Sequence, residues 1–314
     1  MITIGTDCSG IEAPIEALKQ LGIPFQHKWS CEIDKFARQS IRANYEPEIL
    51  YEDITKRNHS QLPDVDIYVC GFPCQSFSLM GKKKGTQDPR SNIMLHCIDV
   101  IKTKQPPVFI LENVKNFKFI QKGKPYNYLL NELTNIVDED GEQVYNVYPD
   151  IYNTKDYGIP QNRERIYIIG MNKDIQLKHY EKPHTMQMTP LDDFIVDKTV
   201  RNMIPSTSLK NNLDMSPDNV NIVLPFSYYF PIPEICPTLT TQCHCVFHKV
   251  YKRNLLPIEC LLLQGFPLDF VQTISNRQMY KQAGNSMSVN VVKCILDIIF
   301  KITIYQFLLL PKSK

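Results

Sequence analysis

The sequence has no excess of charge of one sign. Its formal net charge is +2, and 22% of its 314 residues are charged. This composition excludes a protein that binds a polyanion over its whole surface, so any contact with nucleic acid must come from a local basic patch. The chain also has no internal repeat and no low-complexity tract. At this length it can bury a sizeable core in one large or two ordinary domains.

No apolar run is long enough, without charges, to indicate a membrane-spanning helix. The most apolar stretch extends from Val291 to Leu310, but Lys293, Asp297 and Lys301 interrupt it at every fourth residue. This spacing favours an amphipathic helix that packs on the rest of the protein over a helix that spans a bilayer. We therefore expect no contact with a membrane.

We expect neither a secretory leader nor a disulfide framework. Cysteines scattered through a long chain are typical of free thiols in a reducing compartment. Near residue 243 the Cys-x-Cys spacing differs from the usual zinc knuckle and a partner pair is missing, so we also expect no metal. The residues of that cluster are Cys236, Cys243, His244, Cys245 and His248. The ten cysteines are Cys8, Cys31, Cys70, Cys74, Cys97, Cys236, Cys243, Cys245, Cys260 and Cys294.

Strand-like and helix-like segments alternate through the first half of the chain, which predicts an α/β fold with a doubly wound, mostly parallel sheet. Apolar runs predict strands at 2–6, 25–30, 67–71, 108–111 and 165–170. Helical spacing predicts helices at 13–21, from after residue 34 to 43, and at 92–104, 126–136, 258–263 and 288–300.

A change in composition and periodicity divides the chain. Between residues 173 and 251 prolines and polar residues are frequent and helical periods are few, which indicates a smaller, irregular, β-rich domain. We expect a catalytic and cofactor-binding domain at residues 1–172, this second domain at 173–251, and a return to the first domain at 252–314, where the last helix packs on the sheet.

Cys74 is the candidate nucleophile. It follows the buried strand at 67–71 and stands behind Pro73 in a loop. Ligands of open α/β sheets bind beyond the carboxyl ends of the strands, so this cysteine lies where chemistry usually occurs. A core position without a chemical role is the alternative, because most intracellular cysteines are small buried hydrophobes.

Glu112 ends the next buried strand, and one helix connects the two. A right-handed crossover would bring Cys74 and Glu112 to the same edge of the sheet. A thiolate beside a tunable carboxylic acid suits addition to an electron-poor ring while the acid protonates a ring nitrogen. A cysteine protease would need a partnering histidine, and His96 lies inside a predicted helix. A thiol redox pair of Cys70 and Cys74 is a further alternative.

Acidic residues end the first two strands. Asp7 and Glu32 occupy these positions, and a carboxylate after the second strand typically accepts hydrogen bonds from ribose hydroxyls. The turn Asp7-Cys8-Ser9-Gly10-Ile11-Glu12 has one glycine where the phosphate-binding fingerprint needs three. These residues therefore favour a nucleoside-bearing cofactor without phosphates.

Two basic segments could contact phosphates. The first is the glycine-flanked run Lys82-Lys83-Lys84 with Arg90 beyond it, which could close on a ligand or could be a solvated face. The second contains Arg163 and Arg165, which alternate at the start of a predicted strand and suit bidentate contacts to a phosphate or to an active-site carboxylate. A surface salt-bridge ladder is the alternative for the second.

Taken together, a set of short blocks resembles the DNA cytosine-5 methyltransferase family in residue type and in order, and the set reaches both ends of the chain. The blocks are Asp7-Cys8-Ser9-Gly10, Glu32-Ile33-Asp34, Glu52-Asp53-Ile54, Gly71-Phe72-Pro73-Cys74-Gln75, Glu112-Asn113-Val114, Gln161-Asn162-Arg163-Glu164-Arg165, Glu259-Cys260 with Gln264-Gly265-Phe266-Pro267, and Gln282-Ala283-Gly284-Asn285-Ser286.

The resemblance implies an enzyme with a Rossmann-like fold that transfers a methyl group from S-adenosyl-L-methionine to carbon 5 of cytosine in a specific double-stranded DNA sequence, by base flipping and a covalent cysteine adduct. The implied catalytic residues are Cys74, Glu112, Arg163 and Arg165. The implied cofactor contacts are Asp7, Ser9, Gly10, Ile11, Glu32, Ile33, Asp53, Ile54, Pro73, Asn285 and Ser286. The implied nucleic-acid contacts are Gln75, Ser78, Lys82, Lys83, Lys84, Arg90, Gln161 and Thr238.

The chain departs from the family pattern near the expected cofactor. Cys8 stands where the family usually has an aromatic residue, Glu12 where it has a second glycine, and Ile33 where a tryptophan or another large residue is common. These changes suggest altered affinity. The alternatives in function are an RNA cytosine-5 methyltransferase acting on transfer RNA and a catalytically inactive DNA-binding relative.

The resemblance also implies partners and a location. The segment 173–251 corresponds to the family's target-recognition domain, where sequence specificity lies. We expect a monomer that acts in a restriction-modification system or in phage or viral DNA modification, with a cognate restriction endonuclease acting on the same site without stable contact. The expected location is the cytoplasm of a bacterial or phage-infected cell, or the nucleus or a viral factory for a eukaryotic or viral source.

Overall fold

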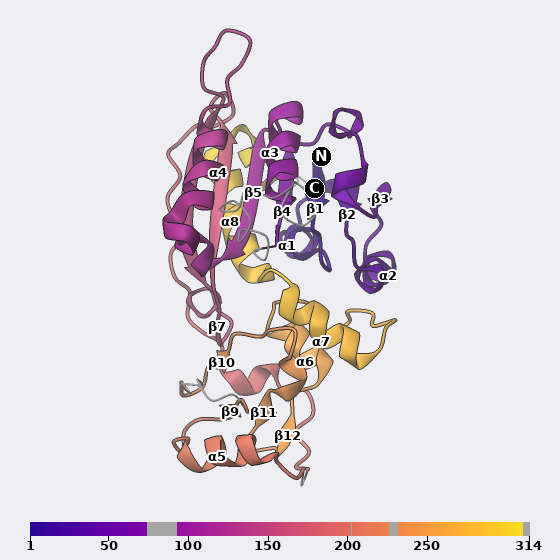
Figure 1. Ribbon diagram of the computed structural model, residues 1–314, viewed down its shortest axis with the longest axis vertical. Helices are drawn as coiled ribbons and strands as arrows, with labels where there is room; N and C mark the ends of the chain where they lie inside the picture. The colour runs from indigo at the N-terminus through magenta and orange to yellow at the C-terminus, as the bar shows by residue number, and fades with distance from the viewer. Residues whose placement is uncertain (74–92, 202, 226–231, 310–314) are drawn as a thin grey trace. The chain divides into compact units, whose positions relative to one another are not determined.

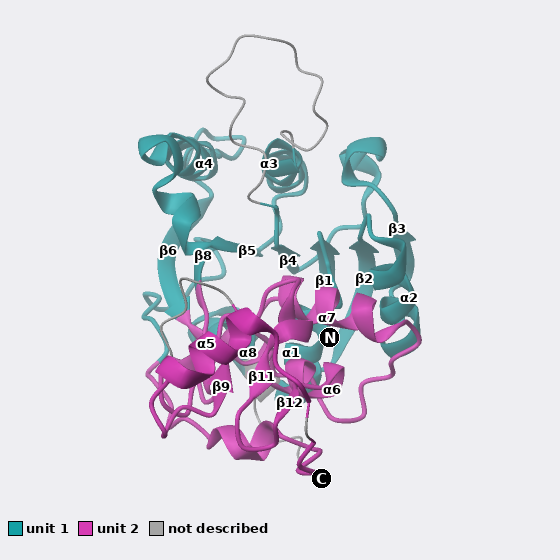
Figure 2. Cartoon of the chain, turned by 60° about the horizontal axis from the view of Figure 1, so that its bottom comes forward, with its two compact units in different colours: residues 1–152, 165–183, 292–314 teal, residues 153–164, 184–291 magenta. Residues whose placement is uncertain are grey.

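The computed structural model describes residues 1–73, 93–201, 203–225 and 232–309. The chain forms two compact units (Figures 1 and 2). Unit 1 contains residues 1–152, 165–183 and 292–314, and unit 2 contains residues 153–164 and 184–291. Unit 2 is therefore built from two separate segments of the chain. The functional division predicted at residues 173 and 251 remains a proposal.

A seven-stranded sheet forms the centre of unit 1, in the order β3-β2-β1-β4-β5-β8-β6. The pairs β1–β2, β2–β3, β1–β4 and β4–β5 are parallel, and β8 runs antiparallel to β5. This confirms the predicted doubly wound, mostly parallel sheet. The strands are β1 (Ile2–Asp7), β2 (Phe25–Cys31), β3 (Ile49–Tyr51), β4 (Ile67–Cys70), β5 (Val108–Val114), β6 (Tyr145–Asn153) and β8 (Glu164–Asn172).

Helices cover both faces of this sheet. Figure 2 shows α3 (Ile93–Lys104) and α4 (Lys124–Thr134) on one side. The other side carries α1 (Ala13–Leu21) and α8 (Val289–Ile302). The Lys293 ammonium of α8 donates to the Gln20 amide oxygen of α1 at 3.5 Å. The next helix along the chain, α2, contains Lys35–Asn44 and follows β2. The Tyr45 hydroxyl, just after α2, donates to the Glu16 carboxylate of α1 at 3.1 Å.

Residues at both ends of α1 explain where this helix begins and ends. Pro14 lies in the first turn, where its missing N–H removes no helical hydrogen bond, and Gly22 ends the helix with a φ of 66°. The apolar face of α1, which includes Ile15 and Leu18, is buried. The helix therefore begins directly after residue 12 and holds the turn between β1 and α1 close to the sheet edge.

The single tryptophan lies over β1 because residue 5 has no side chain. A Cβ built on Gly5 would lie 2.2 Å from the Trp29 ring, so only glycine permits this approach. The Trp29 ring is 1% exposed and stands 5.7 Å from the Tyr68 ring of β4. The core of unit 1 therefore continues from β2 across β1 to β4 beneath the carboxyl ends of the strands.

Among its described residues, unit 2 contains short strands, short helices and irregular connections rather than a large sheet. A three-stranded antiparallel sheet, in the order β12-β11-β9, packs with α5 through Leu209, Val223 and Phe247. A second pair joins β10 to β7 in parallel. The elements are β7 (Gln161–Asn162), α5 (Thr207–Met215), β9 (Ile222–Val223), β10 (Cys236–Pro237), β11 (Phe247–His248), β12 (Arg253–Asn254), α6 (Pro257–Leu262) and α7 (Asn276–Asn285).

All five predicted strands occur, and the sequence pattern missed several other elements. It gave no signal for β3, β6, α5 or α7, because these have short or partly exposed apolar faces. The strand predicted at 108–111 continues to Val114, so Glu112 and Asn113 belong to β5 itself.

One stretch in the described chain is long and apolar enough, by composition alone, to cross a membrane. It is Asn276–Ile302, and 72% of its most apolar window is buried inside the protein. Such burial is typical of a core helix, as we expected for this part of the chain.

Candidate active site

The carboxyl ends of four neighbouring strands are in register. Asp7 of β1 pairs with Cys31 of β2 on one side and with Cys70 of β4 on the other, and Cys70 pairs with Leu111 of β5. The order of the sheet reverses at β1, where open α/β sheets bind their ligands. The residues that follow this row, Glu32 and Glu112 among them, are therefore brought to the carboxyl edge of the sheet in unit 1. The predicted meeting of Cys74 with Glu112 at this edge stays a prediction, because Cys74 lies outside the described residues.

Glu32 is held by two backbone amides. The N–H groups of Gly10 and Asp34 each donate to its carboxylate at 2.8 Å. Burial raises the pKa of Glu32, and the amides of Asp34 and Gly10 oppose this rise by stabilising the charged form. The geometry fixes the carboxylate and leaves further lone pairs on its oxygens as acceptors.

The turn between β1 and α1 is fastened to β2. The Ser9 hydroxyl lies 3.2 Å from both the carbonyl and the amide of Cys31, and the Ser9 amide donates to the same carbonyl at 3.2 Å. Gly10 has a φ of 56°, and Ile11 is fully buried behind the turn. This turn presents the Gly10 amide to Glu32.

Asp7 lies beneath the same edge and is fully buried. Its carboxylate accepts from the Arg57 guanidinium at 2.5 Å and from the Tyr68 hydroxyl at 2.8 Å. Burial raises the pKa of Asp7, and the charge and hydrogen bonds of Arg57 oppose this rise. Arg57 in turn stacks between the rings of Trp29, at 4.7 Å, and Tyr51, at 5.2 Å. Asp7 thus has partners within the protein, and its predicted contact with a cofactor stays a prediction.

A hollow of about 340 Å³ opens at Ile33, the residue after Glu32. Ile33 and Asp53, both predicted from the sequence, line it, while Ile54 is buried behind it. The exposed Ile33 and the Tyr51 ring offer apolar surface to a base, and the carboxylates of Glu52 and Asp53 can accept from hydroxyl and amino groups. This donor set fits the nucleoside part of a cofactor. Its full lining is Ile33, Arg38, Tyr51, Glu52, Asp53, Lys56 and Arg57.

The sequence reasoning missed Tyr51 and Arg57. Tyr51 ends β3 and pairs with Cys31, so it belongs to the same row of strand ends. The strand is only three residues long and half exposed, which left no apolar pattern to detect. Arg57 follows a short 3-10 turn that Asp53 caps through the Thr55 amide at 2.9 Å. Arg57 stands four positions after this cap, and no local spacing in the sequence marks it as the partner of Asp7.

Glu112 and Arg165 form an ion pair, with Nε 3.3 Å from Oε1. Glu112 lies opposite Tyr167 in the antiparallel β5–β8 pair, and Arg165 is two residues from Tyr167, so all three side chains share one face of the sheet. The Arg165 and Glu112 side chains are 15% and 12% exposed. The pair is therefore partly screened from water and still reachable by a ligand.

Asn113, next to Glu112, ties two strand ends together. Its side-chain amide donates to the Phe72 carbonyl at 2.9 Å, and its side-chain oxygen accepts from the Val114 amide at 2.8 Å. The Phe72 ring packs edge-on against Phe117 at 5.4 Å. Phe72 is thereby fixed, and Pro73 follows it at the surface. The sequence reasoning assigned Asn113 no role.

Several predicted residues lie outside the described part of the chain. These are Cys74, Gln75, Ser78, Lys82, Lys83, Lys84 and Arg90. Their roles stay predictions. His96, weighed above as a protease base, lies half-buried on α3, with its Nδ1 in a hydrogen bond of 3.0 Å to Nε2 of His59.

Arg163 and Arg165 belong to different units, which the sequence pattern did not predict. The Arg163 side chain is buried in unit 2 and donates to the carbonyls of Leu239 at 2.8 Å, Gly284 at 3.2 Å and Ser286 at 2.6 Å. These contacts join three distant segments of unit 2. They support a positioning role there, and its predicted role in catalysis stays a prediction.

The remaining predicted contacts also lie in unit 2. Gln161 is fully buried, donates to the Leu263 carbonyl at 2.6 Å and accepts from the Leu239 amide at 3.2 Å, so the structure does not bring it to a surface. Thr238 donates to the Asn162 carbonyl at 2.5 Å. Asn285 is exposed at the end of α7, and Ser286 is buried. Their ligand contacts stay predictions.

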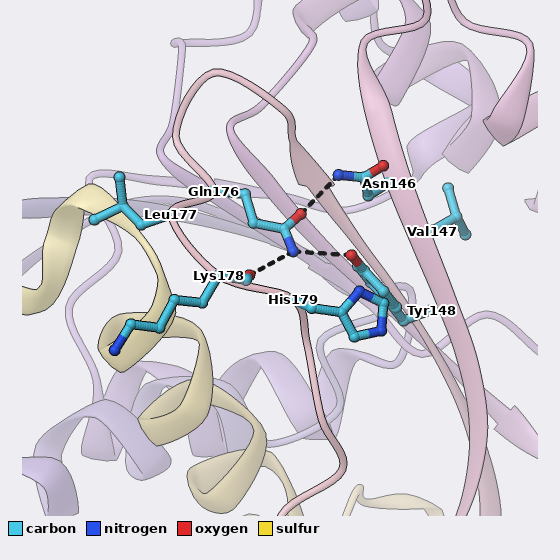
Figure 3. A pocket seen from close by; sticks show the side chains of 7 residues that line it. All are labelled: Asn146, Val147, Tyr148, Gln176, Leu177, Lys178 and His179. Carbon is cyan, nitrogen blue, oxygen red and sulfur yellow. Dashed lines mark hydrogen bonds between the residues drawn. The ribbon is translucent and has the colours of Figure 1, made fainter.

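A second hollow, of about 450 Å³, lies along β6 and contains none of the predicted residues (Figure 3). At its centre the Gln176 side chain bonds to Asn146, Tyr148 and the Lys178 carbonyl. Its polar groups therefore bind one another. Within the described residues no cluster of three or more His, Cys, Asp or Glu side chains could hold a metal ion.

Comparison with known proteins identifies a family. The sequence model described as C-5 cytosine-specific DNA methylase matches residues 6–223 and 227–301. The Type II methyltransferase M.SsoII of Shigella sonnei is 33% identical over 95% of this chain and 79% of its own length. The Type II methyltransferase M.Bsp6I of a Bacillus species is 30% identical over 96% of this chain and 99% of its own length.

A solved structure supports the fold independently. The Entamoeba histolytica methyltransferase EhMeth superposes with a TM-score of 0.73 at 19% identity, covering 96% of this chain and 98% of that protein. At this identity the likeness concerns the fold alone.

Proposed function

The chain belongs to the C-5 cytosine-specific DNA methylase family and is a DNA cytosine-5 methyltransferase, and on that premise we propose how its residues divide the reaction. The cofactor of the family is S-adenosyl-L-methionine. The observation that carries the assignment of residues is the Glu112–Arg165 ion pair. Glu112 stands one residue after Leu111, which pairs with Cys70 at the end of β4, and Phe72 and Pro73 follow β4.

Cys74 is the nucleophile of this proposal. Its thiolate adds to carbon 6 of the cytosine, so that a sulfur–carbon bond forms and the ring electrons move toward carbon 5 and nitrogen 3. Asn113 supports this step through the Phe72 carbonyl, because it fixes the residue two positions before the thiol. The target base must leave the stack first, since its ring cannot be reached inside a duplex.

Glu112 acts as the acid. It gives its proton to ring nitrogen 3 as the thiolate adds, and Arg165 stabilises the carboxylate that this transfer leaves behind. After carbon 5 has been methylated, that carbon loses its proton to a base and the sulfur–carbon bond breaks. The thiolate leaves with the bonding electrons, the ring regains its double bond between carbons 5 and 6, and nitrogen 3 returns its proton to the Glu112 carboxylate.

The cofactor would be held by the edge formed from β1, β2 and β3. Glu32 accepts from the ribose hydroxyls, Ile33 and Tyr51 cover the base, Asp53 accepts from its amino group, and the turn at Ser9 and Gly10 closes the site. When bound, S-adenosyl-L-methionine supplies the methyl group that carbon 5 receives.

Substrate contacts come from two places in this proposal. Lys82, Lys83, Lys84 and Arg90, together with Gln75 and Ser78, contact the phosphates and bases near the flipped cytosine. The segment 173–251 reads the target sequence, since base contacts rather than phosphate contacts carry specificity. We propose that Thr238 belongs to this reading surface.

The cellular setting is proposed from the relatives, which are Type II methyltransferases of bacteria. We propose that the enzyme works as a monomer in the cytoplasm of a bacterial or phage-infected cell. A restriction endonuclease would act on the same DNA site without stable contact with the enzyme.

Bisulfite sequencing of DNA from cells that express the chain tests the proposal. Methylcytosine at one recurring sequence is expected, and a Cys74→Ser protein should leave the same DNA unmethylated. A side-by-side assay with radiolabelled cofactor on duplex DNA and on transfer RNA tests the substrate. Equal methylation by the Cys74→Ser protein would refute the role of Cys74, and transfer to RNA alone would refute DNA as the substrate.

A further inference from the structure

Glu12 occupies an unusual position for an acid. It stands directly before α1, has a φ of 65°, which favours glycine, and is fully buried. Acidic residues at such sites normally face solvent. A charged side chain here therefore needs an explanation in terms of its partners.

The partners of Glu12 are hydroxyl groups of both neighbouring strands. Its Oε1 atom accepts from the Ser30 hydroxyl of β2 at 2.5 Å and from the Thr6 hydroxyl of β1 at 2.8 Å. Ser30 also lies 2.8 Å from Nε2 of His27. The Oε2 atom is buried with no hydrogen-bond partner among the described residues. Glu12 is thus bonded on one oxygen only.

The same network holds the turn that faces the proposed cofactor site. The Thr6 hydroxyl lies 2.8 Å from the Ser9 hydroxyl, and the Glu12 amide donates to the Ser9 carbonyl at 2.9 Å. Ser9 fastens the turn to Cys31, and Gly10 reaches Glu32. A movement of the Glu12 carboxyl would therefore be transmitted through Thr6 and Ser9 to the groups that meet the cofactor.

We propose that Glu12 is a positioning residue for cofactor binding: its neutral carboxyl holds the 7–12 turn closed, whereas an ionised carboxylate, buried without a cation, loosens that turn despite the hydrogen bonds it accepts. This inference rests on the proposed cofactor site at Ser9, Gly10 and Glu32. It adds to that site a group that touches no ligand and couples affinity to pH.

No cation is available to an ionised Glu12. His27 is the nearest basic group, with Nε2 3.7 Å from Oε1, but burial lowers the pKa of His27 to about 4, so it is neutral near pH 7. On β1 the charge of Asp7 is paired with Arg57, and after β2 the nearby Glu32 adds negative charge. On α1 itself Glu16 faces Lys19 and Tyr45.

The balance of these effects places the titration near neutral pH. Burial raises the pKa of Glu12 to about 7, while the hydrogen bonds from Ser30, Thr6 and Ser9 oppose the rise. The ordinary value is 4.5, so the unfolded chain loses this proton first as the pH rises. The folded state therefore loses stability between pH 4.5 and about 7, and above that the loss is complete.

Calorimetric binding of S-adenosyl-L-methionine across pH 6 to 8 tests the proposal, with Glu12→Gln as the variant that cannot ionise. The quantity compared is the affinity of the wild type divided by that of Glu12→Gln at each pH, because the titration of the ligand itself cancels in this ratio. The ratio is expected to fall about tenfold, since the neutral fraction falls about tenfold over this range. Glu46→Gln, at an exposed glutamate, is the control and should follow the wild type.

Two further measurements keep the test independent of activity. Thermal unfolding without cofactor should show a difference between Glu12→Gln and the wild type that grows with pH. Ser30→Ala removes a hydrogen bond that lowers the pKa, so it should move the midpoint of the binding profile to higher pH. A constant ratio in proteins that bind the cofactor would overturn the inference. A wild type that binds no S-adenosyl-L-methionine at any pH would instead overturn the proposed cofactor site, and this inference with it.

Discussion

The side-chain amide of Asn113 donates a hydrogen bond to the Phe72 carbonyl across 2.9 Å, in the interior of unit 1. The two residues lie 41 positions apart and end neighbouring parallel strands. The bond connects the strand of the proposed acid, Glu112, to the segment that leads to the proposed nucleophile, Cys74. We therefore expect Asn113 to influence the relative placement of the proposed acid and the proposed nucleophile.

Asn113→Ala should slow methyl transfer about a hundredfold, because small displacements of reacting groups have effects of that order. The loss of the buried hydrogen bond should also lower the free energy of unfolding by about 1–3 kcal/mol. Cofactor affinity should change little, since Asn113 lies outside the proposed cofactor site. Single-turnover rates, urea unfolding and calorimetry measure the three quantities.

Asn116→Ala is the matched control, because Asn116 is exposed three residues further along the chain. It should behave as the wild type in all three measurements. A rate for Asn113→Ala within a factor of about two of the control would show that the Phe72 contact does not position the nucleophile.

Replacement of Glu112 by Gln should reduce the methyl-transfer rate by about 10²–10⁴-fold, because an amide cannot give a proton to nitrogen 3. Arg165→Lys keeps the charge but loses the fixed guanidinium geometry, so a smaller loss of rate is expected. Glu139→Gln, at an exposed glutamate in the turn after α4, is the control. Full activity of Glu112→Gln on cytosine would remove Glu112 from the mechanism.

The different fates of the arginines show how far the sequence could predict the site. The ends of β4 and β5, and with them the position of Glu112, could be predicted from the sequence. The apolar runs of these two strands are buried on both faces and have clear limits. The alternation of Arg163 and Arg165 predicted one shared face. The chain passes from unit 2 to unit 1 between residues 164 and 165, so Arg163 bonds to carbonyls of unit 2 while Arg165 reaches Glu112.

The partners of buried acids were equally hidden from the sequence. Arg57 stands 50 positions from Asp7, and Ser30 stands 18 positions from Glu12. No local spacing encodes such pairs, since they depend on the register of β1 against β2 and on the path after β3. The acids could be identified from their place after a strand, but the groups that set their charge required the fold.

Arg57→Met should lower the free energy of unfolding by about 3–5 kcal/mol, because it leaves the buried Asp7 carboxylate without its cation. The double variant Arg57→Met with Asp7→Asn should recover part of this loss, since the uncompensated charge is then gone. Lys56→Met, at the exposed neighbour, is the control. Urea unfolding measures the cycle, and strictly additive losses in the double variant would contradict a direct coupling of Asp7 and Arg57.

Buried histidines should destabilise the protein in acid. Burial lowers the pKa of His27, His59 and His248 to about 4 in each case. The unfolded chain binds these protons near the ordinary value of 6.5, so stability should fall as the pH drops from 6.5 through about 4. This slope is opposite in sign to that of Glu12.

His248→Gln isolates one of these contributions. The variant should show a smaller loss of thermal stability between pH 6.5 and 4.5 than the wild type, because glutamine takes up no proton. His184→Gln, at an exposed histidine, should leave the pH profile unchanged. Identical profiles for both variants would show that His248 does not resist protonation in the folded state.

Gly284→Ala tests the packing of the last family block. A Cβ at this position would lie 2.0 Å from the Thr240 carbonyl oxygen and 2.6 Å from the Thr241 amide nitrogen, both of them backbone atoms that cannot rotate away. Helix α7 would have to shift from the 240–241 turn, and the Gly284 carbonyl would move from Arg163. A loss of at least about 1–3 kcal/mol in the free energy of unfolding is expected, as for other overpacked sites.

Arg277→Ala, exposed on the same helix, should have little effect. Because Arg163 also binds the carbonyls of Leu239 and Ser286, the Gly284→Ala protein should exchange the amide hydrogens of these segments faster than the control, and unchanged exchange would show that Arg163 does not depend on the position of α7.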